Sequence, residues 1–328
     1  MDVIEREISI DVLRWLALTG IIIVHISPSP FWEQIRSFDV PMMVFLSAYC
    51  FSRGSYVKAD GYKAYCIKRF KRLVLPCWIF LIAYFFSYYK VLGHTVDWLN
   101  VVLCFSLLTP WYLWIIRIFV LMSLIAPLMI RPVMRMSSQT FFLTIVSGLC
   151  VNEVLCHLSK SYGYVVIIMT FSYLLVFIYG IYVDRLSDKQ ISMIGCGALL
   201  LFLMMAFLYG YKYGNFILVG RYKYPPSLYY LSYAYMCISF LWRMRLKITT
   251  ILQRLSLLRI VAFIGSHTLW IYLWHIPVVS LAEPLSDATM RFAIVYTVAI
   301  IVTFIQSNIV KWLCSRMKNE STICMIEE

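Results

Sequence analysis

Three ionisable residues, Asp11, Arg14 and His25, interrupt the first apolar stretch of the chain. At about 100° per residue in an α-helix, His25 lies about 20° from Arg14 and about 40° from Asp11, so the three share one face. His25 stands roughly 16 Å beyond Arg14 along the helix axis. A neutral imidazole can accept a hydroxyl proton near pH 7, and Asp11 and Arg14 can pair. This shared face predicts that His25 is catalytic and that Asp11 and Arg14 support the helix that carries it. The alternatives are an anchoring pair at the inner interface and a hydrogen-bonded core histidine.

A basic cluster, Lys68-Arg69-Phe70-Lys71-Arg72, precedes a later apolar stretch. Arg69 and Arg72 are three residues apart, so their side chains project on one side of a helix. A guanidinium group can bind phosphate oxygens with two hydrogen bonds. The spacing therefore fits a cytoplasmic ligand with several phosphates, although anchoring at the inner membrane surface also explains a basic cluster.

Further polar residues lie inside apolar stretches, where charge is costly and functional roles are common. Glu153 is one, and His275 is another, placed by the predicted topology at a depth similar to that of His25. The ten cysteines show no CxxC or Cys/His spacing of a metal site. We therefore expect thiols that act as small apolar groups, and no metal.

The composition limits which folds can position these residues. Of 328 residues, 62% are hydrophobic and only 14% are charged. A water-soluble fold could not bury so much apolar surface, and high hydrophobicity also excludes disorder. Because a spanning helix needs about 20 apolar residues, the sequence predicts an all-α polytopic membrane protein of about ten transmembrane helices. The expected spans are 8–27, 38–52, 70–89, 110–130, 139–156, 164–183, 190–210, 226–242, 260–280 and 289–312.

The basic residues predict the topology. Lys and Arg concentrate in the connections that lie in the cytoplasm when both the N- and C-termini are cytoplasmic. The net charge of +13 is explained in this way without a nucleic-acid partner. The apolar stretch 96–108 is shorter, and counting it as a crossing would place the basic loop 243–259 outside. We expect it not to span, and residues 1–328 to form a single transmembrane domain.

Two connections have open interpretations. The outer connection, residues 211–225, holds four tyrosines with Arg221 and Lys223. It is either an interfacial aromatic belt with cations that reach towards water, or a platform that stacks on sugar rings. Gly265-Ser266-His267, inside the expected span 260–280, is interpreted as a close-packing or turn element rather than a site.

These residues together resemble the integral membrane acyltransferase family 3, the O-acyltransferases of bacterial surface polysaccharides. The resemblance covers nearly the whole chain in order. The matching stretches are Ile10-Asp11-Val12-Leu13-Arg14 followed by His25, Pro41-Met42-Met43-Val44-Phe45-Leu46-Ser47, Arg69-Phe70-Lys71-Arg72-Leu73-Val74-Leu75-Pro76, Trp111-Tyr112-Leu113 and Ile271-Tyr272-Leu273-Trp274-His275-Ile276-Pro277. Ala48 and Thr268 depart from the family pattern, which often has Gly and Ser there.

The resemblance implies about ten helices and an acyl-CoA donor, usually acetyl-CoA, bound from the cytoplasm. It also implies a carbohydrate hydroxyl as acceptor, commonly at the outer face. His25 matches an essential histidine of the family. Arg69 and Arg72 match arginines that serve the CoA phosphates or acyl transfer.

The leading hypothesis is therefore a multi-pass O-acetyltransferase of the bacterial cytoplasmic (inner) membrane. It would move an acetyl or other short acyl group to a sugar hydroxyl of a lipid-linked or exported glycan, such as an O-antigen or exopolysaccharide. Four residues are expected to line the acceptor cavity: Trp111, Tyr112, Glu153 and His275. The alternatives are a transporter or flippase of a glycan or small molecule, and a non-catalytic scaffold.

Overall fold

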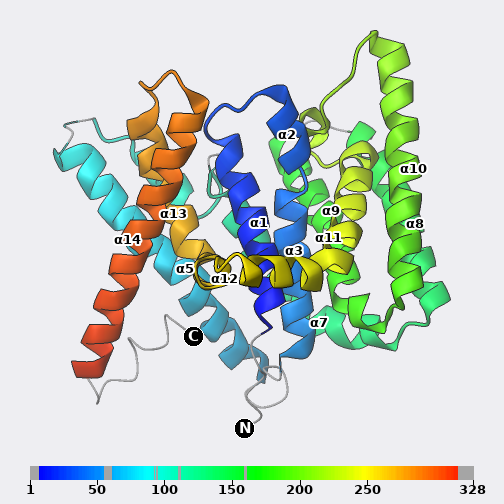
Figure 1. Cartoon of the computed structure of the whole chain (residues 1–328), viewed down its shortest axis with the longest axis horizontal. Coiled ribbons are helices and arrows are strands. Elements are labelled where there is room, and N and C mark those ends of the chain that lie inside the picture. The colour runs from blue at the N-terminus through cyan, green and yellow to red at the C-terminus, as the bar shows by residue number, and fades with distance from the viewer. Residues whose placement is uncertain are drawn as a thin grey trace. The chain divides into compact units, whose positions relative to one another are not determined.

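The computed structural model describes residues 7–54, 61–91, 93, 95–109, 112–158 and 161–316. Within these ranges the regular elements are helices, which confirms the all-α prediction. They are α1 (Ile8–Val24), α2 (Pro30–Arg36), α3 (Asp39–Arg53), α5 (Gly61–Phe86), η1 (Ser87–Val91), α6 (Trp98–Phe105), α7 (Trp114–Arg135), α8 (Ser138–Leu158), α9 (Tyr162–Tyr182), η2 (Val183–Arg185), α10 (Asp188–Tyr213), η3 (Val219–Tyr222), α11 (Leu228–Arg254), α12 (Leu258–Ser266), α13 (Thr268–Ala282) and α14 (Ala288–Arg316) (Figure 1).

The chain folds into two compact units. The first unit comprises residues 1–54 and 125–266, and the second comprises residues 55–124 and 267–328. Helix α7 contributes its beginning to the second unit and the remainder to the first. Each unit therefore combines segments that are far apart in the sequence.

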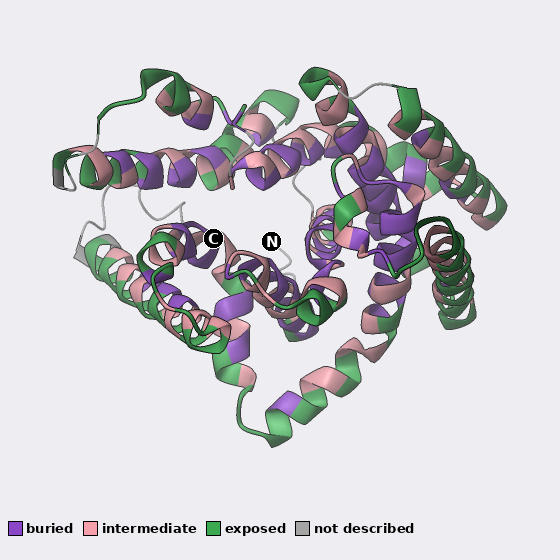
Figure 2. Ribbon diagram, turned by 90° about the horizontal axis from the view of Figure 1, so that it is seen from above, coloured by how far each residue is buried: buried purple, intermediate pink, exposed green. Residues whose placement is uncertain are grey.

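In the first unit, α1 packs against α2, α3, α11 and α12, while α3 packs on α9 and α10 packs on α11. Helix α9 forms much of the core, because 61% of its most apolar stretch is buried, against 11% for α10. Figure 2 shows this contrast between largely buried helices and helices exposed along most of their length. An exposed apolar helix such as α10 is suited to contact lipid.

In the second unit, α13 packs against α5 and α14, and α5 packs against α6. The indole of Trp274 on α13 meets the ring of Phe80 on α5, with centroids 5.7 Å apart, and its Nε1 donates a hydrogen bond of 2.6 Å to Gln306 on α14. Trp78 Nε1 donates to the carbonyl of Phe105 at 2.9 Å and so attaches α6 to α5. Aromatic side chains thus join the four helices.

Six of the described helices are long and apolar enough to cross a membrane. They begin at Gly61, Trp114, Ser138, Tyr162, Asp188 and Ala288. Helices α1, α3 and α13 also match expected spans but have only 17, 15 and 15 residues. Ten crossings and cytoplasmic termini remain predictions. The eight residues of α6 cover about 12 Å, which agrees with the expectation that the stretch 96–108 does not span.

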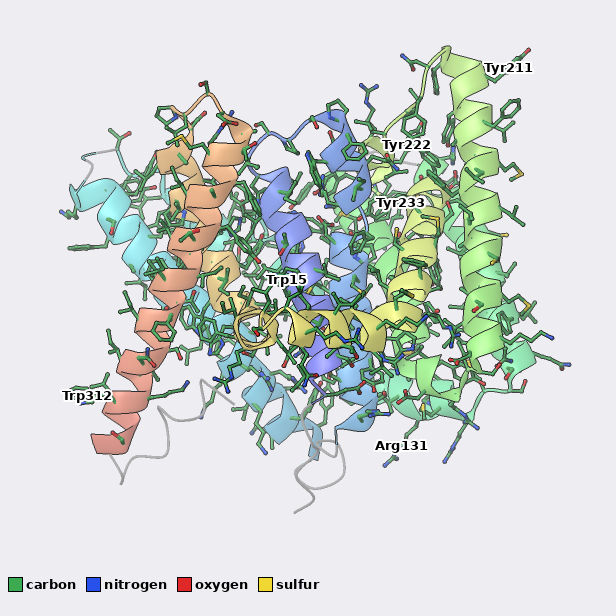
Figure 3. All side chains as sticks on the ribbon, in the orientation of Figure 1. Trp15, Arg131, Tyr211, Tyr222, Tyr233 and Trp312 are labelled. Atoms are coloured by element: carbon green, nitrogen blue, oxygen red, sulfur yellow. The ribbon has the colours of Figure 1, made fainter. Side chains whose placement is uncertain are left out.

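The side chains labelled in Figure 3 place two kinds of residue at opposite ends of the first unit. Tyr211 and Tyr222 belong to the connection predicted to lie outside, and Arg131 belongs to a connection predicted to lie in the cytoplasm. Figure 3 shows the two tyrosines at one end and Arg131 at the other. The predicted topology requires this separation.

Three predicted spans differ from the structure. The helix expected at 70 begins at Gly61, and the helix expected to end at 242 continues to Arg254. The expected span 260–280 is two helices, α12 and α13, because His267 leaves helical geometry with φ of −109° and ψ of 27°. The apolar residues on both sides of Ser266-His267-Thr268 concealed this break, since hydropathy does not report backbone direction. Gly265-Ser266-His267 is thus a packing and turn element, as predicted.

The close approach of α12 to α1 explains the glycine in that element. Figure 1 shows α12 crossing α1, and a Cβ atom at residue 265 would overlap the backbone carbonyl of Asp11. Only glycine allows the two backbones to come so near. The start of α1 is therefore held against α12 by backbone contact.

We expect Gly265→Ala to lower the free energy of unfolding by at least about 1–3 kcal/mol, because the added methyl group forces the two helices apart. Thermal unfolding of the purified full chain in detergent measures this. Gly197→Ala on α10 is the matched control, since a Cβ there meets no atom within 4 Å. An unchanged melting temperature for Gly265→Ala would show that the crossing is looser than described.

Candidate functional site

The ion pair predicted on α1 is present. Asp11 is 2% exposed, and Arg14 Nη1 lies 3.3 Å from its Oδ1. Arg14 Nη2 also donates to Cys50 Sγ on α3 at 3.2 Å. The pair therefore lies inside the helix packing and connects α1 to α3, instead of resting on an exposed surface.

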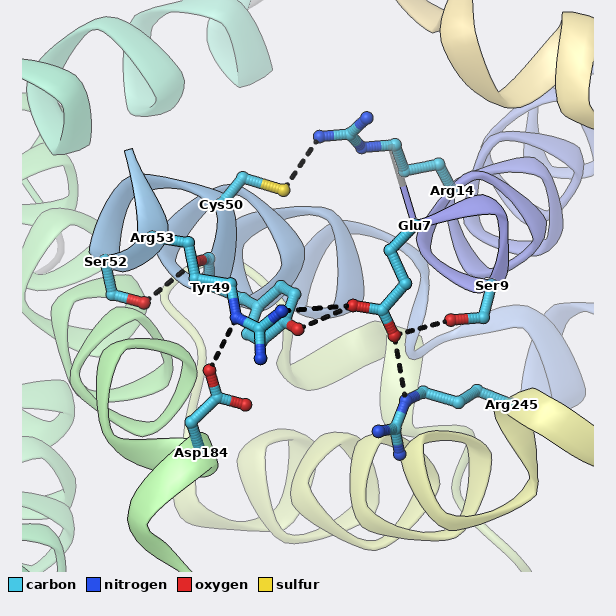
Figure 4. A network of polar contacts seen from close by, with 9 residues as sticks. All are labelled: Glu7, Ser9, Arg14, Tyr49, Cys50, Ser52, Arg53, Asp184 and Arg245. Carbon is cyan, nitrogen blue, oxygen red and sulfur yellow. Dashed lines mark hydrogen bonds and ion pairs between the residues drawn. The ribbon is translucent and has the colours of Figure 1, made fainter. Parts of the chain in front are cut away.

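A polar network that the sequence did not reveal surrounds the start of α1 (Figure 4). Glu7, directly before α1, accepts hydrogen bonds from Ser9 at 2.8 Å and from Tyr49 of α3 at 2.7 Å. Arg53 and Arg245 each lie 3.6 Å from the Glu7 carboxylate. Arg53 also bonds Asp184 at 2.8 Å. The carboxylate of Glu7 thus joins the ends of α1 and α3 to α11 and to the end of α9.

The charge of Glu7 follows from these contacts. Burial raises the pKa of Glu7, but hydrogen bonds from Tyr49 and Ser9 and the charges of Arg245 and Arg53 outweigh burial, so the pKa lies below its usual value of 4.5. Glu7 is therefore ionised at neutral pH. The sequence signal for this network was weak, because its members are separated by up to 238 positions in a chain with many basic residues.

His25 caps the other end of α1. Its backbone N–H donates to the carbonyl of Ile22 at 3.1 Å, and its side chain is half-buried. Two residues later, Ser27 has a left-handed backbone with φ of 55°. This conformation is uncommon outside glycine and persists only where surrounding contacts impose it. The chain therefore turns sharply directly after His25.

Arg69 and Arg72 lie on α5 in the second unit. Helix α5 begins at Gly61, so Arg69 lies in its third turn and Arg72 in its fourth, and the two project on one side, as predicted. The Arg69 guanidinium lies 5.2 Å from the centre of the Tyr65 ring, and Tyr65 donates to the carbonyl of Ser123 on α7 at 2.9 Å. Packing on α7 therefore holds Arg69, while Arg72 is more exposed.

Two predicted cavity residues meet in the second unit. The rings of Tyr112 and His275 lie edge to face with centroids 6.2 Å apart. His275 is fully buried with its Nδ1 against the carbonyl of Tyr272, and the Tyr272 hydroxyl donates to the carbonyl of Tyr112. The three residues thus form one cluster on α13 and the segment before α7. Trp111 lies outside the described residues.

Glu153 has a structural contact in the first unit. Its Oε2 accepts the backbone N–H of Leu228 at 2.7 Å, at the start of α11. The neighbouring Asn152 donates to the carbonyl of Pro226 at 2.8 Å. Helix α8 therefore holds the end of the outer connection. The predicted residues accordingly divide between the units, with Asp11, Arg14, His25 and Glu153 in the first and Arg69, Arg72, Tyr112 and His275 in the second.

The tyrosines of the outer connection differ from one another. Tyr222 stacks on Tyr209 of α10 with centroids 4.7 Å apart and meets the ring of Tyr229 edge to face. Its ring is thus engaged within the protein, whereas Tyr211 is 86% exposed. Lys223 is only 6% exposed, so it is not a cation that reaches towards water. The expectation that Lys223 reaches towards water was therefore wrong.

Lys223 belongs to a buried cluster with Arg36 and Asp39. Arg36 Nη1 lies 2.8 Å from Asp39 Oδ2, and Lys223 Nζ lies 3.7 Å from Asp39 Oδ1. Arg36 is 4% exposed and Asp39 is fully buried. Burial lowers the pKa of Lys223; the Asp39 charge raises it and the Arg36 charge lowers it, leaving a value of about 8. The sequence signal was weak: Arg36 and Asp39 are only three positions apart, but they lie on different helices, at the end of α2 and the start of α3.

The charge balance of this cluster predicts opposite effects of two substitutions. Lys223→Met leaves Arg36 and Asp39 as a one-to-one pair, so we expect the melting temperature at pH 7 to be unchanged or higher. Asp39→Asn leaves two buried cations together, so we expect a loss of about 3–5 kcal/mol. Thermal unfolding of both variants checks this, and equal losses would contradict it.

Lys223 also makes the stability depend on pH. Its pKa of about 8 in the folded protein lies below the ordinary 10.5, so the unfolded chain binds more protons between these values. Stability from this residue therefore increases as pH rises from 8 to 10.5. We expect the melting temperature of the unsubstituted protein, relative to that of Lys223→Met, to increase over that range; a constant difference would contradict the lowered pKa.

Comparison with known proteins identifies the family. No curated protein and no solved structure matches the chain. Residues 7–312 match the family described as "Acyltransferase domain". The match covers most of the 328 residues and includes α1, with Asp11 and Arg14, the turn at His25, and Arg69 and Arg72 on α5. The chain is therefore a member of the acyltransferase family 3 of membrane proteins.

Proposed function

We propose that this membrane acyltransferase is an O-acetyltransferase of the bacterial cytoplasmic membrane. It transfers acetyl from acetyl-CoA to a sugar hydroxyl of a lipid-linked or exported surface glycan. The observation that carries the proposal is the arrangement of α1, which has the pair of buried Asp11 and half-buried Arg14 near one end and His25 at the other. One helix thereby connects the membrane side predicted to be cytoplasmic with an imidazole near the opposite side.

The donor is proposed to bind through its phosphates to Arg69 and Arg72. Both lie on one side of α5, where a phosphate group can meet two guanidinium groups. The contact of Arg69 with Tyr65, which is itself bonded to α7, limits the motion of that side chain. A guanidinium group that is already ordered loses less entropy when it binds phosphate.

The acceptor is proposed to contact Trp111, Tyr112 and His275. The ring edges of Tyr112 and His275 lie together, and aromatic and imidazole groups are suited to sugar faces and hydroxyls. Glu153 is proposed to act through the outer connection, because its carboxylate holds the start of α11. The acceptor would then be a carbohydrate supplied at the outer face.

In a one-step reaction, His25 takes the proton of the sugar hydroxyl as its oxygen attacks the thioester carbonyl carbon. A C–O bond forms, the C–S bond breaks, and the thiolate of CoA receives the proton from His25. In a two-step reaction, His25 first carries the acetyl group and then passes it to the sugar oxygen. Both sequences yield the acetyl ester and CoA.

We expect cells that express the unsubstituted protein to carry acetyl-sized mass increments on surface glycans, and cells that express His25→Ala at equal protein levels to lack them. His25→Ala removes the proposed acceptor of the hydroxyl proton, so we expect the rate of acetyl transfer to fall by at least about a hundredfold. Mass spectrometry of the glycans measures this. His157→Ala is the control, because that histidine side chain is 72% exposed. Identical unacetylated profiles with a plausible acceptor present would instead favour a transporter.

We expect CoA and acetyl-CoA to raise the melting temperature of the purified protein, because a ligand bound only by the folded state stabilises it. The shift should be lost in Arg69→Ala/Arg72→Ala. A control with two exposed basic residues of α7, Arg131→Ala/Arg135→Ala, should keep it. Absence of a shift in folded, unsubstituted protein would contradict the proposed donor, and equal shifts in both double variants would contradict the proposed site.

A further inference from the structure

Several contacts fasten the short helix α2 to the outer connection. Gln34 Oε1 accepts the backbone N–H of Val219 at 3.1 Å, and Tyr233 on α11 donates to the carbonyl of Ile35 at 3.1 Å. The salt bridges of Asp39 with Arg36 and Lys223 complete this attachment. Two segments separated by about 185 positions are therefore held together at the outer end of the first unit.

The same cluster also packs against α1. A Cβ at Gly20 would lie 3.2 Å from the Cβ of Asp39 and 3.4 Å from that of Arg36. Between Gly20 and Arg36 the chain contains His25 and the left-handed Ser27. The cluster thus fixes both ends of the short segment that carries His25, which is how surrounding structure sustains an uncommon turn.

The energetics of burial indicate a role other than stability. Burying each charged group costs several kcal/mol, and well-packed apolar residues often stabilise a fold as much or more. Because burial lowers the pKa of Lys223, keeping this lysine protonated in the folded protein costs free energy at neutral pH. What such a cluster does provide is fixed geometry, because charge-assisted hydrogen bonds such as that from Arg36 to Asp39, 2.8 Å long, are directional.

We propose that the buried cluster of Arg36, Asp39 and Lys223 is a positioning device that holds the junction of α2 and α3 against the outer connection and so fixes His25 for acyl transfer. The inference rests on the proposed function, because it assigns the three residues to the placement of the proposed proton acceptor. They are positioning residues and do not contact the donor. Their effect is therefore on the rate of transfer and not on the binding of acetyl-CoA.

The charge on Lys223 provides a specific signature. Its surroundings contain Asp39, Arg36 and Glu33, and the ring of Tyr224 lies 5.7 Å from its Nζ. Two further titratable groups, Tyr173 and Tyr230, face Asp39. With a pKa of about 8, Lys223 is the member of this group that changes charge near pH 8. Loss of that charge removes the attraction between Asp39, at the start of α3, and the connection.

The test compares membranes that contain the unsubstituted protein or Lys223→Met, using [14C]acetyl-CoA and counting label in the glycan and glycolipid fraction. At pH 7 we expect kcat of the variant to fall by roughly tenfold, since small misplacements have effects of this order, with KM for acetyl-CoA unchanged. The ratio of the two rates should fall towards one as pH rises through 8. Lys223→Arg, which keeps its charge, should retain activity above pH 8. Arg221→Met, which removes an exposed cation of the same connection, should match the unsubstituted protein.

The inference would be overturned if the ratio of the rates of the unsubstituted protein and Lys223→Met did not vary with pH, or if only KM changed. This comparison does not require Lys223→Arg to fold. Hydrogen exchange of peptides covering residues 25–38 at pH 7 gives a reading that is independent of transfer. Faster exchange in Lys223→Met, but not in Arg221→Met, is expected. Equal exchange would refute the positioning role even if transfer were demonstrated. If hydrogen exchange is faster in Lys223→Met but the membranes show no acetyl transfer, the result would instead count against the proposed function.

Discussion

The placement of α1 is the constraint on which the first unit depends. This helix has only 17 residues, yet it packs against α2, α3, α11 and α12. At its start the backbone of α12 approaches so closely that Gly265 cannot carry a side chain. A contact between two backbones has little freedom to slide, because no flexible side chain separates them. The polar groups of α1 therefore have defined positions before any ligand binds.

Charged groups are arranged at both ends of this helix. Near the start, Glu7 joins α1 to α3 and α11, Arg53 of α3 bonds Asp184 of η2, and Arg14 pairs with Asp11. Near the other end, Asp39 lies between two buried cations beside Gly20. The Asp39 cluster is not a strong source of stability, because the loss of hydration offsets the attraction of buried ions. The partly exposed ion pairs at Glu7 contribute little to stability, because water screens them. Both are consistent with a chain that requires accurate placement of a helix and its terminal histidine.

Much of the fold followed from the sequence because apolar length and basic loops have direct physical meaning. The all-α class, most helix positions and the shared side of Arg69 and Arg72 on α5 were predictable in this way. The sequence indicated a packing or turn element at Gly265-Ser266-His267 but not a break in the helix, because the residues on both sides of it are apolar. The burial of Lys223 was missed because its partner, Asp39, is 184 positions away, and a lysine in a connection ordinarily faces water.

The sequence by itself determined that the chain is a helical membrane protein and that it resembles a family of acyltransferases, since composition, periodicity and short motifs are local properties. It also placed Asp11, Arg14 and His25 on one helix face. Only the tertiary structure decided which charges are buried together and which tyrosines stack on one another. Such pairings depend on contacts between distant segments, and the free energy of a charge depends on its surroundings and not on its neighbours in sequence.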